Sequence, residues 1–152
     1  MDISINMPLD SDGFLRRECP HCMEQFKWHH GPANEEAEAH ADPTTYYCPL
    51  CGEPAGPDSW WTQEQVEYAE GLAMPAAFRF VEDELAATFR GNKNISFEPG
   101  DGSDVPDVPA SLTEPDDMPM IASPCHTYEP VKVPGDSSGP FRCLLCGTAF
   151  AV

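Results

Sequence analysis

Two closely spaced cysteine pairs constrain the fold of this 152-residue chain more than any other feature. Cys19 and Cys22 form a Cys-x-x-Cys pair, and Cys48 and Cys51 form a second pair after 25 intervening residues. Two thiolates three residues apart on a tight turn can both point at one metal ion, at sulfur–metal distances of about 2.3 Å. Gly52 suits the left-handed turn position after such a pair. The four cysteines therefore predict a tetrahedral metal site.

A second set of ligand-type residues lies in the last part of the sequence. Cys143 and Cys146, followed by Gly147, repeat the earlier pattern, whereas Cys125 and His126 are adjacent. A site with three cysteines and one histidine is the natural completion of this set. The alternative leaves Cys125 as a buried thiol and His126 as a surface residue. We interpret the set as a second metal site with His126 as its fourth ligand.

The cysteine count argues against disulfide bonds. The chain has seven cysteines, and its first residues carry no basic region followed by an apolar core, so we expect no secretory signal and a cytoplasmic protein. A thioredoxin-like redox site would use one pair at a helix start rather than two matched pairs. No apolar run approaches the roughly 18 residues of a membrane helix, so we expect no membrane partner.

Residues 14–56 and 120–152 resemble zinc-ribbon proteins, which are small β-hairpin modules with two ligands at each of two turns. The segment 48–52, with the sequence CPLCG, is also similar to a rubredoxin knuckle. As a whole the chain resembles small acidic double-zinc-ribbon proteins of bacteria. The resemblance implies two β modules with one metal site each. It does not imply one function, since ribbons occur in transcription factors, ribosomal proteins, enzymes and adaptors.

We expect two zinc ions (Zn²⁺) per chain, one in each site. Sites with four protein ligands leave no open position for substrate, so both ions are expected to be structural. Each module alone is too small to be held together by apolar burial, and metal binding supplies the missing free energy. The histidine of the second set favours zinc there. In the first site, iron with a role in electron transfer is the alternative that the four cysteines leave open.

Composition predicts four parts in a small α+β protein. We expect a first zinc ribbon over residues 1–57, a helical part with a short strand over 58–98, an acidic linker over 99–119 and a second zinc ribbon over 120–152. The linker has six acidic residues, no basic residue and five prolines, which favours an extended chain. The central part is expected to be a kinked helix or a helix pair.

Short strands are predicted on either side of each cysteine pair, because a ribbon needs strands that lead into and out of each knuckle. The expected strands cover residues 14–17, 25–28, 45–47, 129–133, 141–142 and 149–152. Alternation at Ile3, Ile5 and Met7 predicts one more strand, with residues 94–98 as its partner. The acidic segment 34–43 is interpreted as a solvated loop, and its His40 is assigned no role.

The central helix is predicted to begin near Thr62, which opens a capping box. Gly71 and Pro75 interrupt the pattern and favour a break or a kink. An apolar stripe at three- and four-residue steps predicts a face that packs in the core, with an interface as the alternative. It consists of Phe78, Val81, Leu85 and Phe89. Phe80 lies off this face and is the first candidate for a partner contact.

The formal charge of −18, from 26 acidic and 8 basic residues, argues against binding of nucleic acid, where phosphate contacts need Lys or Arg. Arg16, Arg17 and Lys27, near the first ribbon, are flanked by acidic residues. Mimicry of nucleic acid by an acidic face is an alternative, as is a transcription-associated ribbon.

The sequence contains no Gly-rich phosphate loop, no nucleophile elbow and no helix with paired metal-binding histidines. We therefore predict a non-enzymatic zinc-binding protein that acts as an adaptor or regulatory module. Its expected partner is another protein, and a basic surface would suit the acidity of this chain.

Overall fold

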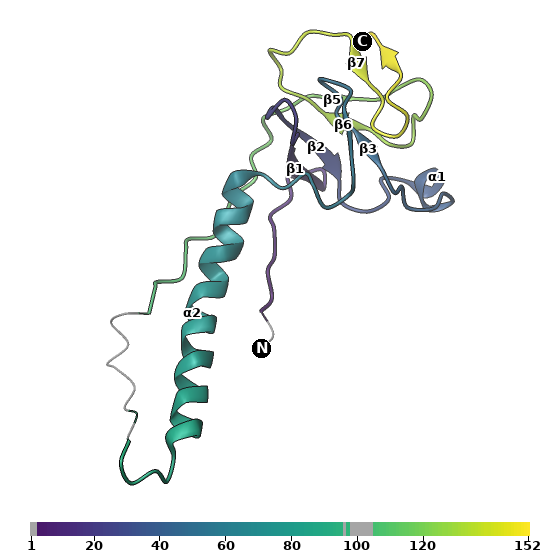
Figure 1. Cartoon of the computed structure of the whole chain (residues 1–152). Coiled ribbons are helices and arrows are strands. Elements are labelled where there is room, and N and C mark those ends of the chain that lie inside the picture. Colours follow the sequence, from purple (N-terminus) through teal and green to yellow (C-terminus); the bar gives the residue numbers. More distant parts are fainter. Residues whose placement is uncertain (1–2, 96, 98–104) are drawn as a thin grey trace. The chain divides into compact units, whose positions relative to one another are not determined.

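The structure is a computed structural model in which the chain forms two units. It describes residues 3–95, 97 and 105–152. The β unit consists of Met7–Gln63 and Thr113–Val152, and the helical unit consists of Met1–Asn6 and Glu64–Leu112. Helices and antiparallel strand pairs both occur, so this is an α+β protein (Figure 1). Within the described ranges, no helix combines the length and the apolar character needed to cross a bilayer.

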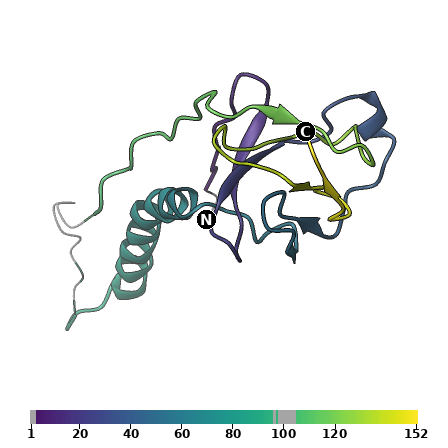
Figure 2. The ribbon, with the colours of Figure 1, turned by 90° about the horizontal axis from the view of Figure 1, so that it is seen from above.

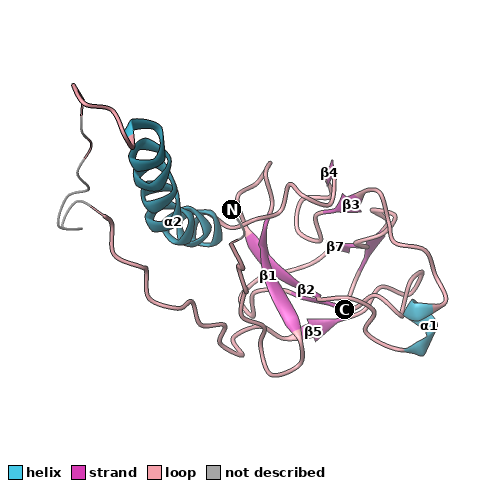
Figure 3. Cartoon of the chain, turned by 90° about the horizontal axis from the view of Figure 1, so that it is seen from below, coloured by secondary structure: helices cyan, strands magenta, loops and turns pink. Residues whose placement is uncertain are grey.

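Short antiparallel strands build three sheets within the described residues of the β unit (Figure 3). The strands are β1 (Phe14–Glu18), β2 (Gln25–His29), β3 (Tyr46–Tyr47), β4 (Pro54–Ala55), β5 (Met120–Ile121), β6 (Val131–Lys132), β7 (Phe141–Arg142) and β8 (Ala149–Phe150). The largest sheet has the order β1-β2-β6-β5, while β3 pairs with β4 and β7 pairs with β8. These strands confirm the pairs expected around both cysteine sets.

The largest sheet joins the two parts of the chain that resemble ribbons. Strand β2 of the first part pairs with β6 of the second, with Lys27 opposite Lys132 and Trp28 opposite Val131. The sequence predicts two separate zinc-ribbon modules, one in each of these parts. In the structure they share one sheet and belong to one unit.

A second junction lies where β3 and β7 come side by side (Figures 2 and 3). The amide of Tyr47 donates to the carbonyl of Leu144 over 2.8 Å, and the amide of Arg142 donates to the carbonyl of Pro49 over 2.9 Å. Each bond runs from the residue before a cysteine pair to the residue after the first cysteine of the other pair. The two contacts are therefore reciprocal.

Aromatic rings occupy the centre of the β unit. Phe26, Trp28 and Trp60 meet edge to face, with ring centroids 5.7, 6.0 and 6.1 Å apart. Trp60, which precedes the long helix, has no exposed surface. Rings of this size remove much apolar surface from water, and edge-to-face pairs add a further contribution of about 1 kcal/mol. Trp60 therefore belongs to the core of the β unit.

Helix α2 (Gln63–Phe89) is one continuous helix, with Pro75 inside it. Of the two predicted alternatives, a kinked helix or a helix pair, the helix pair does not form. A proline in a helix removes one backbone donor and crowds the carbonyl four residues earlier, which here belongs to Gly71. A side chain on Gly71 would meet Pro109 at 3.0 Å, so the segment around Pro109 packs closely on this part of α2. The start of α2 next to Thr62 agrees with the predicted capping box.

The apolar stripe of α2 is largely exposed rather than packed in a core. Phe78, Val81 and Leu85 expose 38%, 54% and 37% of their surface. The prediction that this face packs in the core is therefore wrong, because periodicity identifies a face but not what covers it. Phe80, which lies off this face, is also exposed.

The strand predicted around Ile3, Ile5 and Met7 does not form, and its predicted partner over 94–98 lies partly outside the described residues. Residues 3–7 have no regular secondary structure, and Ile5 is exposed. Asn94, Ile95 and Phe97 form no strand either, while residues 96 and 98 lie outside the described ranges. Alternating apolar residues make a strand only where a neighbouring strand and a buried face are available.

Candidate metal centres

Four sulfur atoms converge at the first centre, which consists of Cys19, Cys22, Cys48 and Cys51. All four Sγ atoms lie within 4.8 Å of one another. Sγ of Cys19 is 3.6 Å from Sγ of Cys51, and Sγ of Cys22 is 3.8 Å from Sγ of Cys48. A tetrahedral ion with four thiolates at about 2.3 Å requires sulfur–sulfur separations of about 3.8 Å. The arrangement therefore has the dimensions of a four-thiolate metal site.

Tight turns between paired strands position these sulfurs. The knuckle 19–23 joins β1 to β2, and the knuckle 48–52 joins β3 to β4. In the first, the amides of residues 21 and 22 donate to Sγ of Cys19 over 3.3 and 3.4 Å. In the second, the amides of residues 50 and 51 donate to Sγ of Cys48, both over 3.4 Å. These donors stabilise negative charge on the sulfurs.

Burial and these amides shift the thiol pKa values in opposite directions. At Cys19 burial raises the pKa, but the amides of residues 22 and 21 and other hydrogen bonds outweigh it, so the pKa lies below the usual 9.0. At Cys22 burial dominates and raises the pKa to about 11. Burial also raises the pKa of Cys48. A cation at the centre would offset the cost of carrying several thiolates together in this buried position.

The second centre consists of Cys125, His126, Cys143 and Cys146, whose ligand atoms also lie within 4.8 Å of one another. Sγ of Cys125 is 3.4 Å from Sγ of Cys146, and Nδ1 of His126 is 3.3 Å from Sγ of Cys143. The knuckle 143–147 joins β7 to β8, while Cys125 and His126 lie between β5 and β6. Cys125 is exposed, which does not fit the alternative of a buried thiol. The structure thus brings all eight predicted side chains together in two groups of four.

Each of the three knuckles ends on a residue with positive φ. The angles are 64° at Met23, 81° at Gly52 and 74° at Gly147. The amides of these residues donate to the carbonyls of Cys19, Cys48 and Cys143, over 3.0, 2.8 and 2.8 Å. The expected turn role of glycine after the pair is confirmed at Gly52, and Met23 occupies the same conformation as a non-glycine residue.

Two hydroxyl groups next to the second centre were not singled out from the sequence. Ser123 is buried, and its Oγ donates to Sγ of Cys143 over 3.1 Å while it accepts from the amide of His126 over 3.3 Å. The hydroxyl of Thr148 lies 3.1 Å from Sγ of Cys146, and this contact lowers the pKa of Cys146 to about 6. The only sequence signal is the proximity of a hydroxyl residue to each ligand pair.

A buried ion-pair network surrounds Lys27 and Lys132, which lie opposite each other on β2 and β6. Nζ of Lys132 lies 2.8 Å from Oδ2 of Asp10 and 2.6 Å from Oδ2 of Asp12. Nζ of Lys27 lies 3.2 Å from the same Oδ2 of Asp10. The side chains of Lys27 and Asp10 are fully buried, so their charges depend on each other for compensation.

The same network holds the chain that leads into β5. Glu114 forms an ion pair with Arg16 at 2.9 Å, and its carboxylate lies 3.3 Å from Nζ of Lys27. Asp117 lies 2.7 Å from Arg16 and 3.0 Å from Lys27. These acidic residues come from the end of the segment expected to be an extended linker. Their carboxylates are therefore structural partners of β1 and β2 in the β unit.

No protein-family model matches this chain, and no curated protein or solved structure matches it either. The resemblance to zinc ribbons therefore rests on the eight residues of the two centres and on the knuckles that hold them.

Proposed function

We propose that this chain is a non-enzymatic zinc-binding adaptor, with one structural zinc ion in each centre. The observation that carries this proposal is the convergence of two complete sets of four ligand atoms, each within 4.8 Å. A set of four protein ligands fills a tetrahedral shell and leaves no position for a substrate or an activated water. Such ions stabilise the fold, so the work of the protein is recognition rather than catalysis.

The donor types support zinc in both centres. A mixed set of three thiolates and one imidazole, as in the second centre, is a common zinc set. The four thiolates of the first centre suit zinc equally well. They also suit iron, which makes a rubredoxin-like electron carrier the second candidate. Elemental analysis of the purified chain distinguishes the two, because zinc is colourless and redox-silent.

The recognition surface that we propose is the exposed apolar stripe of α2. Met74, Phe78, Val81 and Leu85 follow one another at steps of four, three and four residues, and all are exposed. An exposed stripe with this spacing fits a partner helix with a matching apolar face. The helix has six acidic residues and one basic residue. Charge complementarity therefore favours a partner with basic residues beside its apolar face, rather than a second copy of this chain.

Four of the five basic residues of the β unit, all except Arg142, support a protein partner over nucleic acid. Arg16, Lys27 and Lys132 form ion pairs with acidic residues of the chain itself. Arg17 is buried, and its guanidinium lies over the rings of Trp28 and Trp61 at 4.5 Å from each centroid. Side chains engaged in this way are poor donors to a phosphate backbone.

A substitution on the stripe tests the adaptor role. Val81→Glu places a charge in the middle of the stripe, and Ala87→Glu adds the same charge at another exposed position of α2. We expect Val81→Glu to weaken binding of a designed basic, amphipathic helical peptide at least about tenfold, measured by calorimetry on the zinc-loaded chain. Ala87→Glu should leave the affinity within about twofold. Equal loss in both variants, or no binding by the unsubstituted chain, rejects this surface.

A further inference from the structure

A pocket of about 190 Å³ lies in the β unit, outside both metal centres. None of the eight centre residues lines it. Its walls combine aromatic rings with acidic groups. They include Trp28, Tyr46, Tyr128, His40, Asp42 and Glu129. Neither the zinc sites nor the stripe of α2 uses these side chains.

The segment 34–43, expected to be a solvated loop, builds one wall of this pocket. It contains the short helix α1 (Glu35–Glu38), and Asn34 caps this helix by accepting from the amide of Ala37 over 2.9 Å. Ala37 is buried. Most other residues of the segment are exposed, as the interpretation as a solvated loop predicts, but Ala37 and the short helix anchor the segment in the β unit.

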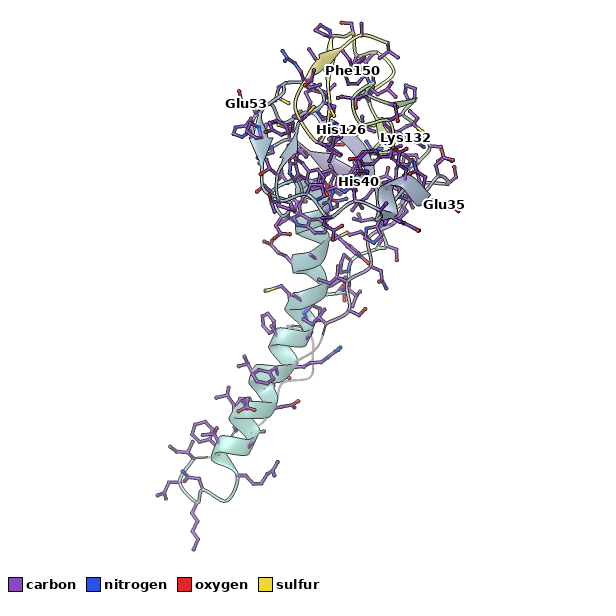
Figure 4. The ribbon with its side chains drawn as sticks, turned by 90° about the vertical axis from the view of Figure 1, so that its right-hand side faces the viewer. Glu35, His40, Glu53, His126, Lys132 and Phe150 are labelled. Atoms are coloured by element: carbon purple, nitrogen blue, oxygen red, sulfur yellow. The ribbon has the colours of Figure 1, made fainter. Side chains whose placement is uncertain are left out.

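Ring stacking fixes the position of this wall. The ring of His40 stacks on the ring of Tyr128, with centroids 4.2 Å apart and planes 4° from parallel. The ring of Tyr128 also meets the ring of His126 edge to face at 5.8 Å (Figure 4, in which His40 and His126 are labelled). The side chain of Asn34 donates to the carbonyl of Tyr128 over 3.4 Å. The pocket is thus a formed feature of the unit.

The opposite wall is a second aromatic stack. The ring of Tyr46 lies 4.4 Å from the ring of Trp28, tilted by 31°. The guanidinium of Arg17 covers Trp28 at 4.5 Å. Trp28 and Tyr46 both line the pocket, and aromatic rings favour cations with a planar face.

Two carboxylates at this pocket form no ion pair with a Lys or Arg among the described residues, although His29 acts electrostatically on one of them, Glu129. Within the described ranges, no ion pair and no side-chain hydrogen bond engages Asp42 or Glu129. The imidazoles of His29 and His40 also line the pocket, and Nδ1 of His29 lies 3.1 Å from the carbonyl of Gly31. In contrast, Asp10, Glu114 and Asp117 of the same unit are matched by Lys or Arg. Carboxylates without a Lys or Arg partner in a concave site favour binding of a cation.

We propose that this pocket binds a guanidinium group. A planar guanidinium can donate two hydrogen bonds to a carboxylate while its face stacks on an aromatic ring, and an ammonium cannot do both. Asp42 and Glu129 supply the acceptors, and Tyr46 and Tyr128 supply the rings. Two sources share this chemistry, an arginine side chain of a protein and a free guanidinium compound.

The test is a titration of the full, zinc-loaded chain with blocked arginine (N-acetyl-arginine amide), followed by nuclear magnetic resonance of its backbone amides. We expect saturable shifts at residues 42, 46 and 128–129, and weaker binding of blocked lysine by at least about threefold. A parallel titration with agmatine separates the sources, because a site for free guanidinium compounds binds agmatine and rejects blocked arginine.

Variants distinguish the pocket from general attraction to an acidic protein. Glu129→Gln and Asp42→Asn should each weaken binding about tenfold, because each removes a charged acceptor of the guanidinium. Glu36→Gln removes an exposed charge from the same part of the chain without lining the pocket, and should change the affinity less than twofold. Absence of saturable shifts with both guanidinium probes overturns the proposal. Equal effects of the three variants, or tighter binding of lysine, also overturn it.

Discussion

The amide of Tyr47 donates a hydrogen bond of 2.8 Å to the carbonyl of Leu144, and this bond joins a knuckle of the first metal centre to the knuckle of the second. The bond from Arg142 to Pro49 mirrors it over 2.9 Å. Each centre therefore helps to hold the backbone of the other. We expect the two metal sites to be coupled in stability, although their ligands share no atom.

Loss of a ligand from one centre should weaken the other. Cys143→Ser removes a ligand of the second centre whose neighbour, Leu144, accepts the bond from Tyr47. We expect this variant to bind one zinc ion, with an affinity at the first centre about tenfold lower than in the unsubstituted chain. Competition with a chromophoric chelator measures both affinities. Unchanged affinity at the first centre would show that the two sites are independent.

Gly147 has a packing role as well as a conformational one. Its φ is +74°, and a Cβ atom there would lie 2.8 Å from Cδ1 of Tyr47. Gly147→Ala should therefore lower the free energy of unfolding by about 2–3 kcal/mol. Gly31→Ala is the matched control, because Gly31 has φ +81° and no atom within 4 Å of the added Cβ. The control should lower the free energy of unfolding, measured by urea denaturation, by about 1 kcal/mol. If both variants lowered the free energy of unfolding equally, contact of the added Cβ with Tyr47 would not explain the effect at Gly147.

The buried ion pairs should make stability depend on acid pH. Burial alone would raise the pKa of Asp10, but Lys132, the amide of Phe14 and Lys27 together hold it at about 2, below the usual 3.8. A carboxylate with a lowered pKa stabilises the fold above its unfolded pKa. Stability should therefore fall as the pH drops from about 4 to about 2.

Asp10→Asn tests the same network at neutral pH. It leaves two buried ammonium groups without their shared carboxylate, so we expect a loss of about 3 kcal/mol in the free energy of unfolding. The variant should also lose part of the acid dependence between pH 4 and pH 2. Asp136→Asn, at an exposed position, should change neither quantity by more than about 0.5 kcal/mol. Similar behaviour of the two variants would argue against the network.

Ser123 should tune the second centre without affecting the fold. Its hydroxyl donates to Cys143 and accepts from the amide of His126, so Ser123→Ala removes support from two ligands. We expect zinc affinity at the second centre to fall about tenfold to a hundredfold. Ser138→Ala, at an exposed position, serves as the control. A second centre with unchanged affinity in Ser123→Ala would mean that the hydroxyl is only a packing group.

The sequence was most informative where a site depends on local spacing. A Cys-x-x-Cys turn positions its sulfurs by itself, so Cys19 and Cys22 could be assigned from their separation alone. The hydroxyl of Ser123 could not be assigned in this way, because its contact with Cys143 spans 20 residues and arises only after β5 and β7 come together. The pocket beside Tyr128 could not be predicted either, because its lining residues are far apart in the sequence.

Patterns of charge and periodicity were less reliable. The net acidity of residues 99–119 does not show that Glu114 forms an ion pair with Arg16 in the β unit, because a charge count does not include distant partners. The stripe around Val81 has the periodicity of a core face and is nevertheless exposed. A periodic pattern states which residues share a face, and the fold decides what that face meets.

The central claim is that two zinc ions hold the two centres. Native mass spectrometry together with elemental analysis, on chain purified without added metal, tests it most directly. We predict two zinc ions per chain, and loss of the ordered circular-dichroism spectrum of the β unit when a strong chelator removes them. One ion or none per chain, iron at the first centre, or a metal-free chain with an unchanged spectrum would contradict the claim.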